Sequence, residues 1–207
     1  MNTALKLFGF DRVFDTNFSA DLTIMEEGTE LLLRLYTALV KKEAAAFPQF
    51  TSCSPGWVKY LEHFYPEYIP NLSSAKSPQQ MFGAVTKSYY AEKMGIDPKK
   101  IVMVSIMPCT AKKYEIHRAD QDANGMPDVD YVLTTRELAK MIKRSGINFN
   151  ELPEEAFEPP LGLGTGAGVI FGATGGVMEA ALRTAVEKLT GETLPSLDFT
   201  DVRGVAG

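Results

Sequence analysis

The sequence has few of the residue types that mark several common classes of protein. Of its 207 residues only two are cysteine and two are histidine, and the formal net charge is -5. Two cysteines far apart in a chain of this length exclude a disulfide-stabilised scaffold, so we expect reduced thiols, metal ligands or catalytic groups. The acidic balance argues against nucleic acid as the main partner, because phosphate binding requires clustered lysine and arginine.

Long hydrophobic runs are also missing from the sequence. No segment reaches the length that spans a bilayer, and residues 1–14 contain no apolar run of signal-peptide length. We therefore expect a soluble, cytoplasmic protein with neither a membrane nor a nucleic-acid partner. Hydrophobic residues make up 45% of the chain, which is enough to form a core in one domain or in two small lobes.

Helical and strand patterns alternate along the chain, which is typical of an α/β protein. Helices are predicted at about 3–8, 21–42, 77–94, 134–146 and 177–189, with a buried strand at 101–106 and a further strand at 129–133. Pro78 is expected to begin and Gly95 to end the third helix, and Thr134 with Glu137 forms a capping-box pattern at the start of the fourth. The proline- and glutamate-rich segment 150–160 is predicted to link a first lobe, residues 1–149, to a partial second lobe, residues 161–207.

Both cysteines follow predicted strand ends, Cys53 after the strand-like pair 50–51 and Cys109 after the strand 101–106, where open α/β sheets place their sites. A thiolate is both a nucleophile and a soft-metal ligand, and an iron-sulfur cluster normally takes four of them. Lysines at 112 and 113 lie close to Cys109 in the sequence and favour its thiolate form. A lone cysteine is nevertheless more often a small buried hydrophobe, so the residues alone leave both interpretations open. A papain-like dyad fits poorly, because neither His63 nor His117 lies in a recognisable signature.

A glycine-rich run, G-L-G-T-G-A-G, occupies residues 162–168. Such a run before a helix can bind phosphate, because glycine lets the backbone approach the ligand. Here the run follows the linker segment rather than a clear strand, and no lysine stands where a P-loop needs one. Phosphate or dinucleotide binding is therefore the weaker interpretation of this segment.

The segments around the two cysteines are the most specific signal in the chain. They read T-S-C-S-P-G-W over residues 51–57 and M-P-C-T-A-K-K-Y-E over residues 107–115. They resemble the first two signature motifs of the catalytic domain of iron-only (FeFe) hydrogenases, T-S-C-C-P-x-W and M-P-C-x-x-K-x-x-E. The similarity extends through essentially the whole chain. It implies the α/β fold of that catalytic domain, with two lobes of mostly parallel sheets flanked by helices, incomplete at both ends.

The resemblance also implies a cofactor and a set of site residues. The family's H-cluster joins a 4Fe-4S cubane through a cysteine thiolate to a two-iron unit with CO and cyanide ligands, and it interconverts protons, electrons and dihydrogen. By resemblance, Cys109 is a cubane ligand and Cys53 is the non-ligating cysteine that passes protons to the distal iron. Lys112 would donate to a cyanide. The other residues implied to line the cofactor are Met107, Ser77, Gln79 and Phe171.

The family's proton path is implied to run through Glu27, Glu30 and Ser73, with Arg34 near its outer end. The spacing agrees with this assignment, because residues three and four apart share one face of a helix. Spacing alone favours the simpler interpretation of a solvated charge cluster.

The chain departs from the family pattern at its metal ligands. Ser54 stands where the family has a second cubane cysteine, and a serine hydroxyl is a poor cluster ligand. The third family motif, with two further cysteines, does not occur, and the chain begins after the family's opening strand and loop. With one of four expected ligands, we predict that this polypeptide alone is not an active hydrogenase.

Several origins and roles remain open from the sequence. The chain is either a truncated or engineered piece of a hydrogenase, or a natural split subunit completed by another polypeptide. The alternatives are a non-enzymatic relative, such as an iron-sulfur assembly or sensory protein, and a pure interaction scaffold. The family's partners are a ferredoxin or similar electron carrier and the hydrogenase maturation proteins. A complementing chain or self-association is a further expectation, because unpaired sheet edges recruit partners.

Overall fold

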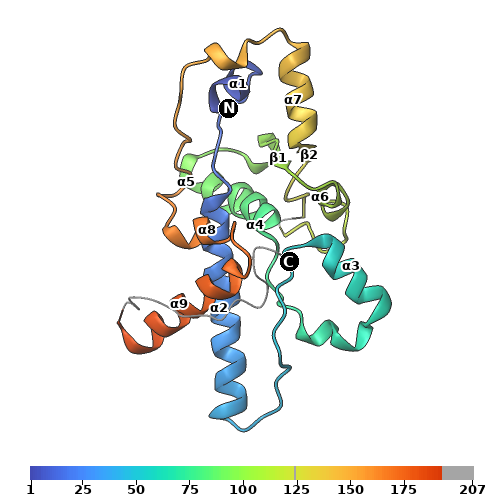
Figure 1. Ribbon diagram of the computed structural model, residues 1–207, viewed down its shortest axis with the longest axis vertical. Helices are drawn as coiled ribbons and strands as arrows, with labels where there is room; N and C mark the ends of the chain where they lie inside the picture. Colours follow the sequence, from blue (N-terminus) through green and yellow to red (C-terminus); the bar gives the residue numbers. More distant parts are fainter. Residues whose placement is uncertain (124, 193–207) are drawn as a thin grey trace. The chain divides into compact units, whose positions relative to one another are not determined.

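The computed structural model describes residues 1–123 and 125–192 (Figure 1). They form two compact units, each built from two separate stretches of the chain. The first unit comprises residues 1–16 and 79–163, and the second comprises residues 17–78 together with the described residues from 164 onward.

This division differs from the lobes expected from the sequence. The segment predicted as a linker, residues 150–160, lies within the first unit. There the Glu158 N–H donates to the carbonyl of Val13 at 3.0 Å, and the side chain of Asn2 donates to the carbonyl of Ala156. Residues 193–207 of the predicted second lobe lie outside the described residues. A lobe boundary at 150–160 therefore stays a prediction.

The first unit contains a two-stranded parallel sheet, as the buried strand patterns predict. Strand β1 (Val104–Met107) pairs with β2 (Tyr131–Thr134), and their last residues, Met107 and Thr134, are partners in the register. Both strands are shorter than predicted: β1 begins three residues and β2 two residues later than expected, and each ends one residue later. Because the strands are parallel, their carboxyl ends meet at one edge of the sheet.

Helix α7 (Thr135–Arg144) follows β2 directly. Thr134 and Glu137 form the capping box expected from the sequence, in which each side chain bonds to the backbone N–H of the other residue. Helix α1 (Asn2–Leu7) supplies Ala4 and Leu5 to the core of this unit. The other buried members of that core are Val13, Leu138 and Ile142.

The helix predicted to span 77–94 is present as three consecutive helical segments. They are α4 (Pro78–Val85), a π-helical turn η2 (Thr86–Tyr90) and α5 (Ala91–Met94). Proline at the first helical position begins the run, and Gly95 ends it with a positive φ of 65°. The remaining elements of this unit are short: η3 (Pro98–Lys100), α6 (Ala111–Glu115) and η4 (Phe149–Glu151).

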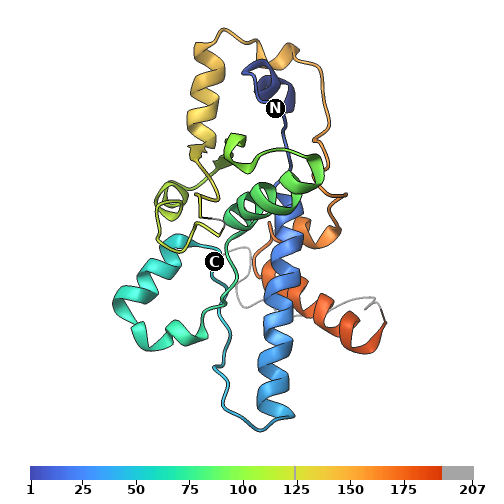
Figure 2. The same ribbon diagram turned by 180° about the vertical axis from the view of Figure 1, so that it is seen from behind.

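The second unit is built around the long helix α2 (Asn17–Leu39). Helices α8 (Gly166–Ile170) and α9 (Gly176–Thr190) pack against α2 (Figure 1). After the end of α2, the chain returns alongside this helix toward α3 (Pro55–Phe64), as seen from behind in Figure 2. After η1 (Pro66–Asn71), a parallel bridge joins Phe50 to Leu72. This bridge precedes Cys53, as expected of the strand-like pair at 50–51.

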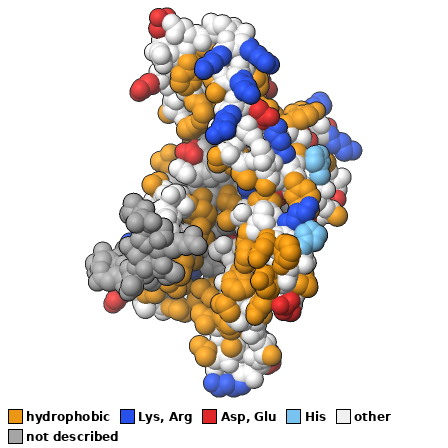
Figure 3. Space-filling view, turned by 45° about the vertical axis from the view of Figure 1, so that its right-hand side comes forward, with side chains coloured by type: hydrophobic (Ala, Val, Ile, Leu, Met, Phe, Trp, Pro, Cys, Tyr) orange, Lys and Arg blue, Asp and Glu red, His pale blue; other side chains and the backbone are white. Residues whose placement is uncertain are grey.

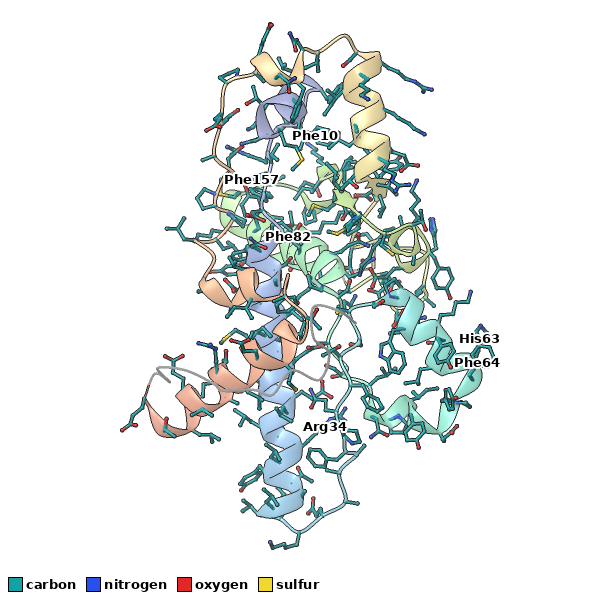
Figure 4. All side chains as sticks on the ribbon, in the orientation of Figure 1. Phe10, Arg34, His63, Phe64, Phe82 and Phe157 are labelled. Carbon is teal, nitrogen blue, oxygen red and sulfur yellow. The ribbon has the colours of Figure 1, made fainter. Side chains whose placement is uncertain are left out.

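The surface of α3 and η1 carries many exposed aromatic side chains, and hydrophobic groups gather on the face of the molecule in Figure 3. Neighbouring rings are in contact in the pairs Trp57–Tyr60, Tyr60–Phe64, Tyr60–Tyr65 and Tyr65–Tyr68. His63 lies on the same helix (Figure 4). The aromatic rings therefore form one continuous cluster along this part of the second unit.

A cavity of about 580 Å³ lies within the first unit. Phe10, Phe82 and Phe157 are among the hydrophobic side chains that line it (Figure 4). The whole of β1 lines it as well, and so do the polar side chains of Gln79 and Ser105.

Candidate functional site

Glu30 is the centre of a hydrogen-bonded cluster in the second unit. Its Oε2 accepts hydrogen bonds from Ser73 Oγ at 2.7 Å and from the Ser74 N–H at 2.9 Å, while Arg34 Nε donates to Oε1 at 3.1 Å. Burial acts to raise the pKa of Glu30, but the hydrogen bonds from Ser73, Arg34 and Ser74 outweigh it, so the pKa lies below its ordinary value. Glu30 is therefore held as a carboxylate.

Glu27 lies one turn away on α2 and differs from Glu30 in its environment. Its side chain is only 3% exposed, and its Oε1 is buried without a hydrogen-bond partner among the described residues. Burial raises the pKa of Glu27 to about 7, although the Ser52 backbone and the Ser73 hydroxyl act in the opposite direction. A carboxyl with a pKa near neutrality can both take up and release a proton at physiological pH.

Arg34 does more than pair with Glu30. Its guanidinium also donates to the carbonyls of Ala46 at 3.0 Å and Leu72 at 2.7 Å, and more weakly to that of Asn71 at 3.4 Å. Figure 4 shows Arg34 on α2 beside the returning segment. Arg34 thus ties two distant loop segments to the helix that carries both glutamates.

The first cysteine motif lies at the start of α3. Cys53 is half-buried, and Ser54 is exposed at the N-cap position without a side-chain capping bond. Ser52 Oγ donates to the Ala75 carbonyl at 2.8 Å, and the Trp57 indole donates to the Thr51 carbonyl at 3.2 Å. These bonds fix the motif on both sides of Cys53.

The second cysteine motif belongs to the first unit. Cys109 is exposed just beyond the end of β1, and Met107, the last residue of that strand, is half-buried. Lys112 on α6 donates to both carboxylate oxygens of Glu115, at 3.2 and 3.0 Å. Gln79 donates to the same carboxylate at 3.0 Å. The structure therefore brings the predicted residues Lys112 and Gln79 together through Glu115.

The remaining predicted residues, Ser77 and Phe171, belong to the second unit, where Ser77 is buried and Phe171 is half-buried. Site residues predicted from the sequence are therefore divided between the two units. The cluster of charged and polar groups around Glu30 is complete within the second unit, and the Lys112 group is complete within the first.

The glycine-rich run is held by a carboxylate. Asp21 on α2 accepts hydrogen bonds from the Gly168 N–H at 2.7 Å, from the Thr165 hydroxyl at 2.8 Å and from the Thr165 N–H. A Cβ added to Gly168 would stand 2.6 Å from the Asn17 carbonyl oxygen, so only glycine permits this close approach. Since Asp21 occupies the place that a phosphate would take, the phosphate-binding interpretation of this run is not supported.

The donor set of the described residues does not fit a complete iron-sulfur cluster. Across residues 1–123 and 125–192, no three or more His, Cys, Asp or Glu side chains are grouped so that they could hold a metal ion. Four thiolates are the usual requirement, and the chain has two cysteines. No chemical step through the cluster is therefore assigned to this chain by itself.

The chain belongs to the iron-only hydrogenase family: the model of the iron-only hydrogenase large subunit, C-terminal domain, matches residues 1–207. It is 59% identical to the NADP-reducing hydrogenase subunit HndD of Solidesulfovibrio fructosivorans, over 100% of this chain and 35% of that protein. The structure of apo FeFe-hydrogenase HydA1 from Chlamydomonas reinhardtii is 56% identical, with a TM-score of 0.79, over 97% of this chain and 50% of that one. These matches confirm the family and the α/β fold expected from the sequence.

A more distant relative is the cytosolic Fe-S cluster assembly factor narfl of Xenopus tropicalis, 32% identical over 95% of this chain and 44% of that protein. The chain thus spans half or less of the length of these proteins. None of the helices formed by the described residues has the length and apolar character needed to cross a membrane.

Sequence reasoning missed three residues that organise the site. Glu115 is the last residue of the second motif and lies three residues after Lys112, a spacing that pairs opposite charges on a helix, so both signals could have identified its role. Ser105 and Asp21 left no such signal, because their partners come from distant segments of the chain.

Proposed function

We propose that this chain is part of the catalytic domain of an iron-only hydrogenase and supplies the proton path of the reversible reaction between protons, electrons and dihydrogen. In the complete enzyme the H-cluster would supply the redox chemistry. The observation that carries the proposal is the burial of Glu27, whose Oε1 has no partner among the described residues and whose pKa is raised to about 7.

The neighbours of Glu27 support a relay. Glu30 is kept ionised by Ser73, Ser74 and Arg34, and the Ser73 hydroxyl also influences the pKa of Glu27. The Ser52 backbone, which acts on Glu27 as well, is adjacent to Cys53. A proton acceptor near neutral pH beside a fixed carboxylate and a hydroxyl is suited to passing protons toward a thiol.

We further propose that the chain alone does not evolve hydrogen, because its own thiols do not complete a four-ligand cluster. The test has two arms. The chain, purified anaerobically from cells that also produce the maturation proteins, is assayed for hydrogen evolution with a reduced electron donor. Hydrogen above a no-protein control would contradict this part of the proposal.

In the second arm, the chain is co-produced with a polypeptide that supplies the remaining part of the domain, and residues of the relay are varied. Glu30→Gln and Glu27→Gln are expected to lower hydrogen evolution by about a hundredfold or more, the scale of a lost proton-transfer group, with iron content unchanged. Glu26→Gln, an exposed neighbour on the same helix, is the matched control. Full activity of the Glu30→Gln protein would reject the relay.

The alternative is a non-enzymatic role, in iron-sulfur assembly, in sensing or as a scaffold. It draws support from the 32% identity with the assembly factor narfl. We favour the hydrogenase assignment because identity with hydrogenases is much higher and because Lys112, Met107, Glu27, Glu30 and Ser73 are all present. A scaffold would tolerate the neutral changes Glu27→Gln and Glu30→Gln, whereas the relay would not.

We also propose the family's partners for the intact protein: a ferredoxin or similar electron carrier and the maturation proteins. A complementing chain or self-association would supply the missing ligands. A cytoplasmic location is likewise a proposal.

A further inference from the structure

A buried network of hydrogen-bonded polar side chains in the first unit ends at Lys112. Ser105 Oγ on β1 donates to Gln79 Oε1 at 2.8 Å, and Gln79 Nε2 on α4 donates to Glu115 Oε2 at 3.0 Å. Lys112 Nζ completes the network by donating to Glu115, so hydrogen bonds link β1, α4 and α6, and the Glu115 carboxylate accepts from both Gln79 and Lys112. Ser105, Gln79 and Glu115 are 8%, 3% and 5% exposed.

The Ser105 hydroxyl sets the direction of the hydrogen bonds in this network, because it fixes the orientation of the Gln79 side-chain amide. A serine hydroxyl bound to an amide oxygen places the amide nitrogen of Gln79 toward Glu115. The same nitrogen also donates to the Lys112 carbonyl at 3.3 Å. Glu115 is thereby held by a neutral donor from α4, and its carboxylate is available to Lys112 on its own helix.

We propose that Glu115, held by Gln79 and Ser105, is a positioning residue that fixes the Lys112 ammonium beside the end of β1. This inference rests on the proposed function, in which Lys112 is a donor in the active site. Without Glu115, the four-carbon side chain of Lys112 would lose its fixed direction, because a lysine side chain is flexible unless it is paired.

The adjacent residue offers a natural comparison. Lys113 pairs with Glu137 at 2.7 Å, but both side chains are open to solvent, at 41% and 42% exposure. The Lys112 and Glu115 side chains are 12% and 6% exposed. A buried ion pair with further hydrogen bonds holds its partners much more firmly than an exposed pair does. Two neighbouring lysines therefore differ in how strictly they are positioned.

The test measures the acetylation rate of each lysine in the full chain, using an amine-reactive acetyl ester at one fixed pH and peptide mass spectrometry. In the wild-type chain we expect Lys112 to react more slowly than Lys113. Glu115→Gln should raise the Lys112 rate by about tenfold, which corresponds to roughly 1.4 kcal/mol. Glu115→Asp, which keeps the charge, should restore part of the protection.

Glu137→Gln is the matched control, since it should raise the Lys113 rate and leave Lys112 unchanged. Lys87 reports on the fold: its side chain is 3% exposed and pairs with Asp130 at 2.7 Å, so it reacts quickly only if the unit unfolds. If Lys87 also reacts quickly in the Glu115→Gln chain, that variant has unfolded, and the milder Ser105→Ala variant is used in its place. We expect Ser105→Ala to raise the acetylation rate of Lys112 and of no other buried lysine.

The inference would be overturned if Lys112 reacts at the wild-type rate in a folded Glu115→Gln chain. The same result in a folded Ser105→Ala chain would overturn it where Glu115→Gln does not fold. A rise confined to Lys112 would support it. The assay needs neither cluster nor hydrogen evolution. A chain that lacks the proposed hydrogenase role would still give the labelling result, and the two failures are therefore distinguishable.

Discussion

At the scale of single residues, two glutamates one turn apart on the same helix have opposite protonation behaviour. Glu30 receives hydrogen bonds from Ser73 and Arg34 and stays ionised, whereas Glu27 is buried and its pKa is about 7. The difference arises because burial dominates at Glu27, whereas hydrogen bonds from Ser73, Arg34 and Ser74 outweigh burial at Glu30. It is what makes Glu27 the better candidate for a group that changes protonation.

Glu27 should also make the stability of the chain depend on pH. Its pKa is raised in the folded state from 4.5 to about 7, so between these values the folded chain binds a proton that the unfolded chain releases. Folding stability should therefore fall as pH rises from about 4.5 to 7, by up to roughly 3 kcal/mol. Glu27→Gln should remove this loss, so the free energy of unfolding of the variant should increase relative to that of the wild type as pH rises.

The measurement is urea unfolding of both chains at several pH values between 5 and 8. Glu26→Gln, with its exposed side chain, serves as the control and should follow the wild type. Parallel curves for wild type and Glu27→Gln across this pH range would show that the raised pKa is wrong.

Sequence spacing placed Glu27, Glu30 and Arg34 on one helix face, and the structure confirms that Glu30 and Arg34 meet. It could not predict the other partners of Arg34, the carbonyls of Ala46 and Leu72, because they are fixed only when the returning segment packs on α2. The family resemblance supplied Ser73, which no local pattern indicates. Whether these residues act as the family's do stays a prediction.

At the scale of elements, helix α4 approaches the loop before β2 as closely as a backbone allows. A Cβ added to Gly83 would stand 2.2 Å from the carbonyl oxygen of Asp128 and 2.6 Å from its carbonyl carbon. Lys87, on the next turn, pairs with Asp130 and donates to the carbonyl of Pro127, both at 2.7 Å. The helix and the loop are thus joined both by contact and by a buried charge.

Gly83→Ala is expected to destabilise the chain by about 3 kcal/mol, because the obstructing atoms belong to the backbone and cannot move aside cheaply. Gly56→Ala is the matched control: it lies in α3 with nothing within 4 Å of the added Cβ. That change should stabilise the chain by about 0.5–1 kcal/mol. Thermal and urea unfolding of the two variants measure both effects, and equal stabilities would contradict the close packing at Gly83.

Most elements were predictable because their signals are local. The capping box at Thr134, the proline that begins α4 and the glycine that ends α5 lie where the sequence indicates. The π-helical turn η2 was not predictable, since nothing in T-K-S-Y-Y distinguishes it from an α-helix. The strand limits shifted because pairing, rather than the apolar pattern, decides where a short strand ends.

At the scale of the whole molecule, the chain shares a family with hydrogenases but carries only part of the length of its relatives. The two-unit division was not predictable from composition. The proline-rich segment 150–160 looks like a linker, yet its backbone bonds to residues near the N-terminus. Long-range pairing of this kind leaves no periodic signal.

The iron content of the purified chain follows from its number of thiols. With two cysteines, we expect well below four iron atoms and four sulfides per chain after anaerobic purification in the presence of the maturation proteins. Ser54→Cys should raise the iron content without reaching that level. Ser52→Cys would control for the effect of an added thiol. Stoichiometric iron in the unaltered chain would mean that ligands from another molecule complete the site.

The interleaving of the two units has a consequence for synthesis of the protein. The core of the first unit needs Ala4 and Leu5 from one end and Leu138 and Ile142 from far along the chain. At a translation rate of roughly 5–20 residues per second, Leu138 and Ile142 are synthesised on the order of ten seconds after helix α1. During that interval its apolar face is available to chaperones, so production of this chain should respond to how quickly it is translated.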